Sequence, residues 1–106
     1  MRAEFNATIH APIRLRACAM LAAVKELEFS LLRDELGVAD SVLSKHLKVL
    51  AEEGYVSIRR PVGMGGRPKT WVSLTKAGRE ALKGHLAALQ ELARQAEGLD
   101  EPGPKR

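Results

Sequence analysis

The chain has 106 residues, a formal net charge of +4 and one cysteine. This length is typical of one small domain, and a single cysteine excludes an intramolecular disulfide and a cysteine-rich zinc site. No apolar run approaches the roughly 18 residues of a membrane span. We expect no signal peptide, because the start of the chain lacks a long apolar stretch after its cation. The sequence therefore predicts a single cytoplasmic domain with no membrane partner.

The positive charge is concentrated in the middle third of the chain. Residues 41–79 contain eight Lys or Arg residues and two acidic ones, whereas residues 1–40 contain five against six and residues 80–106 four against five. A basic balance that is confined to one segment favours nucleic acid as a partner over a generally cationic surface.

The first helix of the core is predicted to begin at Pro12, which suits the first position of a helix. Apolar residues recur at helical spacing from there to about Leu27, which predicts a core helix. Before it, Phe5 and Ile9 are expected to pack on a neighbouring element. Cys18 lies within the helix, and we interpret it as a small buried hydrophobe, because no cation-rich partner of a redox-active thiol flanks it.

Two further helices are predicted, joined by a turn that contains a glycine. The first covers residues 31–36, with Ser30 as its cap. The second runs from about residue 40 to residue 53, and either Asp40 or Ala39 occupies its cap position. Two helices in this arrangement, with the second cationic on its outer face, indicate a helix-turn-helix.

The second of these helices has one face for a core and one for a partner. At 100° per residue its leucines fall on one side, together with His46, which we interpret as a packing or backbone-bonding histidine. Short hydroxyl groups and long cations fall on the other side. Such a face suits base edges and phosphates in a major groove, which admits one α-helix, although a merely solvated face is the alternative. The residues of this outer face are Ser41, Ser44, Lys45 and Lys48.

A β-hairpin follows. Residues 55–60 and 70–74 are strand-like, and the segment between them is rich in glycine and proline, which predicts a hairpin with a long tip. A phosphate-binding loop is the competing interpretation of the glycines, but the Lys-Ser/Thr pair and the following helix of a P-loop are absent. The cations along or near the tip are Arg59, Arg60, Arg67 and Lys69.

The final predicted helix begins after Thr75, which caps it, and extends to about Glu97. Its apolar stripe is roughly 33 Å long at 1.5 Å per residue, and the small core is too short to cover it. The part beyond about Ala87 is therefore expected to pack against the same helix of a second copy. The predicted homodimer interface comprises the N-terminal segment and Leu82, Leu86, Leu89 and Leu92.

Five segments resemble, in order and spacing, the compact winged helix-turn-helix transcriptional regulators related to the MarR and ArsR families. They span about residues 9–85 and read His10-Ala-Pro-Ile-Arg-Leu15, Leu43-Ser-Lys-His-Leu-Lys-Val-Leu50, Glu53-Gly-Tyr-Val56, Gly66-Arg-Pro-Lys-Thr70 and Leu74-Thr-Lys-Ala-Gly-Arg79. The chain departs from the common pattern at Ala39, where Ser or Thr usually caps the recognition helix, and at Val42, where a polar residue often stands.

The resemblance implies a mainly α fold with a small β-hairpin (α+β), a winged helix-turn-helix with a long C-terminal dimerisation helix. The expected division is one domain over residues 1–98, with the winged helix core at 11–75, the dimerisation helix at 76–98 and a flexible tail at 99–106. The implied function is that of a prokaryotic homodimer that binds an inverted repeat in double-stranded DNA and regulates transcription.

In this interpretation the outer face of the recognition helix contacts base edges, and the cations of the hairpin mainly contact phosphates, with Arg67 best placed for a narrow minor groove. A winged helix used for protein–protein contact without specific DNA binding is the alternative. No catalytic arrangement is recognisable, so an enzyme is not expected, and no cofactor is predicted. We also expect no metal site, because His10, His85 and Cys18 contain no close-spaced pair of ligands.

Overall fold

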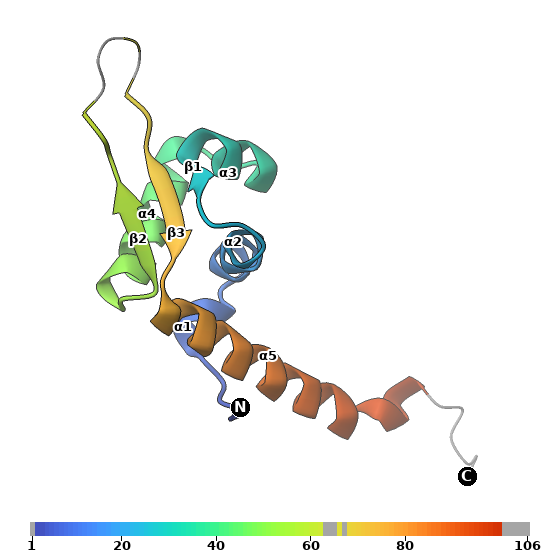
Figure 1. The fold of residues 1–106 in the computed structure, drawn as a ribbon. Helices are drawn as coiled ribbons and strands as arrows, with labels where there is room; N and C mark the ends of the chain where they lie inside the picture. Colours follow the sequence, from blue (N-terminus) through green and yellow to red (C-terminus); the bar gives the residue numbers. More distant parts are fainter. Residues whose placement is uncertain (1, 63–65, 67, 101–106) are drawn as a thin grey trace.

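The structure is a computed structural model that describes residues 2–62, 66 and 68–100 (Figure 1). Helices make up most of it, and three short strands form one antiparallel sheet. It confirms the predicted fold class, a mainly helical winged helix with a long C-terminal helix. The elements are α1 (Ala7–His10), α2 (Pro12–Ala22), β1 (Leu27–Glu28), α3 (Phe29–Leu36), α4 (Asp40–Glu52), β2 (Val56–Arg59), β3 (Trp71–Leu74), α5 (Lys76–Gln95) and the 3-10 helix η1 (Glu97–Asp100).

The sheet has the order β1-β3-β2. The hairpin of β2 and β3 pairs Val56 with Leu74, and β1 adds to the other edge of β3 with Leu27 opposite Val72. Val56, Val72 and Leu74 are buried, because alternate residues of a strand point to the same side and this side faces the helices. We call β2, β3 and the chain between them the wing. Most of its tip, including Arg67, lies outside the described residues.

The core lies between the helices and the inner face of the sheet. Its fully buried apolar side chains come from α1, α2, α3, α4 and β3, and the largest are Ile9, Leu21, Leu32, Leu43, Leu47, Leu50 and Val72. Cys18 is also fully buried, as predicted. Burial raises the pKa of its thiol to about 11, so the thiol stays protonated at neutral pH and fills space as a small apolar group.

Helix α2 ends at Ala22, five residues before the predicted end at Leu27. The guanidinium group of Arg79 explains this early end, because it donates to the carbonyl oxygen of Ala22 at 2.9 Å and to that of Val24 at 3.1 Å. The carbonyl group of Ala22 is one that the end of a helix leaves without an intrahelical partner, and that of Val24 lies in the turn after the helix. The chain then turns, and Leu27 is a strand residue rather than a helical one.

The starts of α3 and α4 also differ in detail from the prediction. Helix α3 begins at Phe29, so Ser30 lies inside it and is not its cap. The backbone N–H of Phe29 donates to the carbonyl oxygen of Thr70 at 2.8 Å, which attaches the first residue of the helix to the wing. For α4, the structure decides between the two candidate caps: Ala39 is the N-cap and Asp40 is the first helical residue.

The N-terminal segment forms a short helix, α1, which the sequence pattern did not predict. The side chain of Asn6 caps it by accepting from the N–H of Ile9 at 2.9 Å. Ile9 is fully buried, so it packs on the core as expected, whereas Phe5 is half exposed. Helix α1 contacts α2, α4 and α5. It therefore connects the C-terminal helix to the helix-turn-helix.

Helix α5 begins after Thr75, whose hydroxyl accepts from the N–H of Gly78 at 2.9 Å, as a capping residue does. A side chain at Gly78 would collide with the carbonyl oxygen of Tyr55, so a glycine is required inside this helix. The second half of α5 projects away from the body at the end opposite the wing (Figure 1). None of the helices in the described part of the chain is long and apolar enough to cross a membrane.

Candidate nucleic-acid interface

Helix α4 presents a polar face to solvent because its apolar face is fixed in the core. Leu43, Leu47 and Leu50 are buried at spacings of four and three residues, which places them on one side of the helix. The residues of the opposite side are exposed, and they are Ser41, Ser44, Lys45 and Lys48. The structure thus brings four of the eight predicted site residues onto one continuous surface.

The first turn of α4 has no side-chain cap at Ala39. Asp40, in the first turn, is held by Arg33 of α3, whose Nη1 donates to a carboxylate oxygen of Asp40 at 2.8 Å. Arg33 also donates to Asp34 at 2.9 Å, and these two carboxylates raise its pKa. The ion pair partly neutralises the acidic residue nearest to the polar face. Val42, where the common pattern often has a polar residue, is also exposed on this turn.

His46 faces the body of the protein and not the exposed surface. Its Nδ1 lies 3.1 Å from Nη1 of Arg14 in α2, and because a guanidinium only donates, this nitrogen is the acceptor. Nε of the same Arg14 donates to the carbonyl oxygen of Thr8 in α1 at 2.6 Å. Partial burial lowers the pKa of His46, and the charges of Arg14 and Lys45 lower it further. His46 is therefore a neutral residue that attaches α4 to α1 and α2.

A crevice between α4 and the wing adds a further cation to the polar face. It has a volume of about 310 Å³ and an apolar floor that includes Leu47 and Ile58. Its polar lining includes Ser44 and Lys48 on α4 and Arg60 on the wing. The structure thus brings Arg60 together with Ser44 and Lys48, as a surface that contacts a duplex from both elements requires.

Arg59 points the other way. Neighbouring strand residues face opposite sides of a sheet, and the side of Arg59 is the outer one. There its Nη2 lies 2.7 Å from Oε2 of Glu26, in the connection between α2 and β1. Its guanidinium carbon is 5.9 Å from the centre of the Trp71 ring. The structure does not bring Arg59 together with the cations of α4.

The two remaining predicted residues of the wing are Lys69 and Arg67. Lys69 is exposed and lies just before β3. Arg67 lies outside the described residues, so its predicted contact with a minor groove stays a prediction. The structure therefore brings five of the predicted residues together, namely Arg60 and the four residues on α4. Arg59 faces the other side of the wing.

His10 and His85, which are far apart in the sequence, are in contact in the structure, so the expectation that they are isolated is wrong. Nδ1 of His10 lies 3.1 Å from Nε2 of His85, where α1 packs on α5. Sequence reasoning missed this pair because 75 positions separate the two residues and neither has a local motif. Among the described residues no group of three or more His, Cys, Asp or Glu side chains is arranged to hold a metal ion.

A helix-turn-helix with an exposed, basic second helix and a β-hairpin beside it defines a winged helix DNA-binding domain. A family model with this description matches residues 13–93, so the chain belongs to the winged helix DNA-binding domain family. An uncharacterized protein of Methanocaldococcus jannaschii is 33% identical over 85 residues, which are 80% of this chain and 91% of that protein.

Solved structures of transcriptional regulators share the fold. A transcriptional regulator homologue from Pyrococcus horikoshii superposes with a TM-score of 0.77 at 28% identity, covering 89% of each chain. A MarR family regulator from Silicibacter pomeroyi gives a TM-score of 0.63 at 29% identity over 91% of this chain and 63% of that one. These similarities confirm the resemblance to winged helix regulators of the MarR type.

Proposed function

We propose that this chain is a homodimeric transcriptional regulator that binds specific sequences in double-stranded DNA, and that it is not an enzyme. Helix α4 enters the major groove, and the wing contacts the backbone or the minor groove. One observation carries the proposal: two serines and two lysines are exposed on α4 opposite its buried leucines, and Arg60 of the wing lies in the same crevice as Ser44 and Lys48. The cytoplasm of a prokaryotic cell is the location that fits this role.

The side chains divide by chemistry. Lys45 is the residue proposed to reach guanine acceptors, and Ser41 and Ser44 are less selective readers of base edges. Lys48 lines the crevice and reaches either a base edge or a phosphate. Arg60, Arg67 and Lys69 are proposed as phosphate contacts that fix orientation. Arg59 joins them only when its ion pair with Glu26 opens.

The proposed dimer interface is the projecting half of α5 together with the N-terminal segment. Leu86 and Leu92 are 43% and 50% exposed within one protomer, and a second copy of the helix would cover them. Leu82 is buried inside its own protomer, so it supports the base of α5 and is not itself available to a partner. A two-fold dimer would present its two α4 helices to successive major grooves, which lie about 34 Å apart. The division into a core at residues 11–75 and a dimerisation helix at 76–98 is proposed on this basis.

An electrophoretic mobility assay with genomic DNA fragments tests the proposal. The wild-type chain should select particular fragments, and its affinity should fall steeply with salt, because each neutralised phosphate contributes a slope of about −0.9 in a double-logarithmic plot. The Lys45→Ala/Lys48→Ala variant should lose this binding. Lys83→Ala, which removes an exposed cation on α5, is the matched control and should bind as wild type does.

Two results would contradict the proposal. One is that the wild-type chain binds no fragment even at low salt. The other is that the double variant binds as tightly as the control. Either result would favour a winged helix that contacts another protein, since the cations of α4 would then be dispensable.

A further inference from the structure

His85 is a fully buried polar residue in the middle of α5, and both of its ring nitrogens have partners. Nδ1 lies 2.9 Å from the backbone nitrogen of Asn6. Nε2 lies 3.1 Å from Nδ1 of His10. These two contacts attach the N-terminal segment and α1 to the C-terminal helix.

The contacts determine where the protons are. A backbone N–H only donates, so Nδ1 of His85 must be the acceptor and carries no hydrogen. The hydrogen of a neutral imidazole then lies on Nε2 of His85, which donates to Nδ1 of His10. His10 in turn carries its own hydrogen on Nε2. Only neutral rings satisfy this arrangement, because a proton added to either Nδ1 would face another N–H group.

The surroundings bury the His85 ring, whereas His10 is exposed, and they connect the pair to the rest of the segment. The ring of Phe5 lies 4.9 Å from that of His10 and 4.7 Å from that of His85. The side chain of Asn6 donates to the hydroxyl of Tyr55 at 2.9 Å. The N–H of Glu4 donates to the carbonyl oxygen of Gly84 at 2.9 Å, and the carbonyl oxygen of Arg2 approaches so closely that a Cβ at residue 84 would lie 3.0 Å from it.

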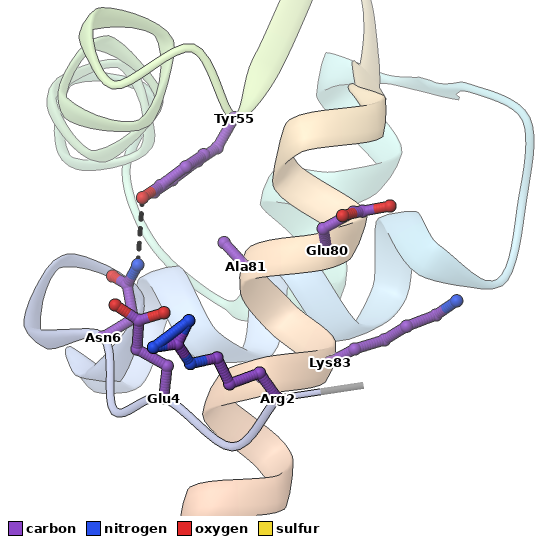
Figure 2. Close-up of a pocket in the computed structure, with 8 residues that line it drawn as sticks. Arg2, Glu4, Asn6, Tyr55, Glu80, Ala81 and Lys83 are labelled. Atoms are coloured by element: carbon purple, nitrogen blue, oxygen red, sulfur yellow. Dashed lines mark hydrogen bonds between the residues drawn. The ribbon is translucent and has the colours of Figure 1, made fainter.

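Several elements contribute charged or titratable groups to the surroundings of the pair. The N-terminal segment contributes Arg2 and Glu4, α5 contributes Glu80 and Lys83, and the chain before β2 contributes Tyr55. These line a cavity of about 440 Å³ beside Asn6 (Figure 2). Arg14 of α2 is engaged with Thr8 and His46. Of these groups, His10 is the one in direct contact with the His85 ring.

We propose that His10 and His85 form a pH-sensitive latch, which holds the N-terminal segment and α1 on α5 while both rings are neutral and releases them when the pair takes up a proton. This inference does not depend on DNA binding. Its consequence for the proposed regulator is that the segment lies at the proposed dimer interface.

The direction of the effect follows from the burial of His85. Burial lowers the pKa of His85 below its ordinary value of 6.5, and the neighbouring His10 lowers it further. The latched state therefore binds fewer protons than the released state. Its stabilisation is complete above about pH 6.5 and is lost as the pH falls below that value.

Amide hydrogen exchange measured by NMR tests the latch. The reporters are the N–H groups of Glu4, Asn6, Ile9 and His10, which are hydrogen-bonded in the latched state. Between about pH 7.5 and about pH 5, their protection factors, corrected for intrinsic exchange, should fall by about tenfold or more. Amides in the middle of α4 should keep their protection.

Two variants make the test specific. In the double variant His10→Gln/His85→Gln, the side-chain oxygen at residue 85 can accept from Asn6, the NH2 group can donate to the amide oxygen at residue 10, and neither side chain titrates in this range. Its segment should stay protected at the lower pH. His46→Gln removes the other histidine whose pKa is lowered and should retain the wild-type response.

The latch is overturned if the wild-type segment is equally protected at both pH values, or if the double variant His10→Gln/His85→Gln loses protection on acidification as wild type does. A second test uses the wild-type chain alone, so it does not depend on whether a variant folds. At about pH 7.5, the ring-nitrogen chemical shifts should show His85 with its proton on Nε2, and a proton on Nδ1 would overturn the proposal.

Discussion

Arg59 and Glu26 form an ion pair on the outer face of the wing, with Nη2 and Oε2 2.7 Å apart. Both side chains are partly exposed, so the pair contributes little to folding, on the order of 0–1 kcal/mol for pairs of this kind. The pair matters because it orients the Arg59 side chain, a predicted DNA contact, away from α4. Arg60, the next residue, faces the crevice instead.

The two arginines should therefore differ in DNA binding. We expect Arg60→Ala to weaken binding to all sequences and to reduce the magnitude of the salt slope by about one, as the loss of one phosphate contact does. Arg59→Ala should have a much smaller effect. The measurement is the dissociation constant at several salt concentrations. Equal losses in the two variants would show that the Glu26 pair opens on DNA.

Lys45 should determine sequence preference rather than general affinity. Lys45→Ala is expected to reduce the difference between a selected site and random DNA, with a cost of about 1–3 kcal/mol at the position that it reads. Competition assays with selected and scrambled duplexes measure this difference. Lys69→Ala is the comparison, since a phosphate contact should weaken both duplexes alike. A Lys45 variant with unchanged discrimination would argue that other side chains read the bases.

Gly78 should not tolerate a side chain, although it lies inside a helix. Gly78→Ala gains about 1 kcal/mol of helix propensity, but its Cβ would collide with the Tyr55 carbonyl group and lie 2.9 Å from Cδ1 of Leu74. We expect a net loss of about 1–3 kcal/mol in the free energy of unfolding, measured by urea denaturation at a fixed protein concentration. Gly98→Ala, with nothing within 4 Å of the added atom, is the control and should change stability little. A Gly78 variant as stable as wild type would mean that α5 shifts freely against the wing.

The projecting half of α5 should determine the oligomeric state. Leu86→Lys combined with Leu92→Lys is expected to give a folded monomer, because both side chains are exposed in one protomer and would be buried between two. Sedimentation velocity measures the mass, and circular dichroism checks the fold. Lys83→Glu, a charge change at an exposed residue of the same helix, should leave the mass unchanged. A double variant that still sediments as a dimer would place the interface elsewhere.

The sequence was sufficient to predict the fold where local pattern and packing agree. The leucines of α4 at spacings of three and four, the glycine after α3 and Thr75 before α5 each fix an element through interactions within a few residues. The errors are at positions where a distant partner decides. At the end of α2 Arg79 binds the carbonyl oxygen of Ala22, and at the start of α3 the carbonyl oxygen of Thr70 binds the N–H of Phe29.

The candidate site follows the same rule. The outer face of α4 could be read from helical periodicity alone, because its buried side is so clearly apolar. Arg59 and Arg60 face different sides because strand residues alternate and because Arg59 pairs with Glu26, 33 positions away. Counting charged residues along the chain reveals neither of these causes. The contact of His10 with His85 is equally invisible to local pattern, since each lies alone in its own helix.

The Trp71 ring, which lies beside Arg59, can also serve as a spectroscopic probe. Trp71 is the only tryptophan in the sequence, and it lies on the wing, 5.9 Å from a guanidinium carbon. The tryptophan fluorescence of the protein therefore comes from this one residue and is sensitive to the charge of the Arg59 guanidinium group. A change that moves Arg59 away from Glu26 would alter the wavelength or the intensity of the Trp71 fluorescence. The unlabelled protein therefore contains a fluorescent probe of contacts made by the wing.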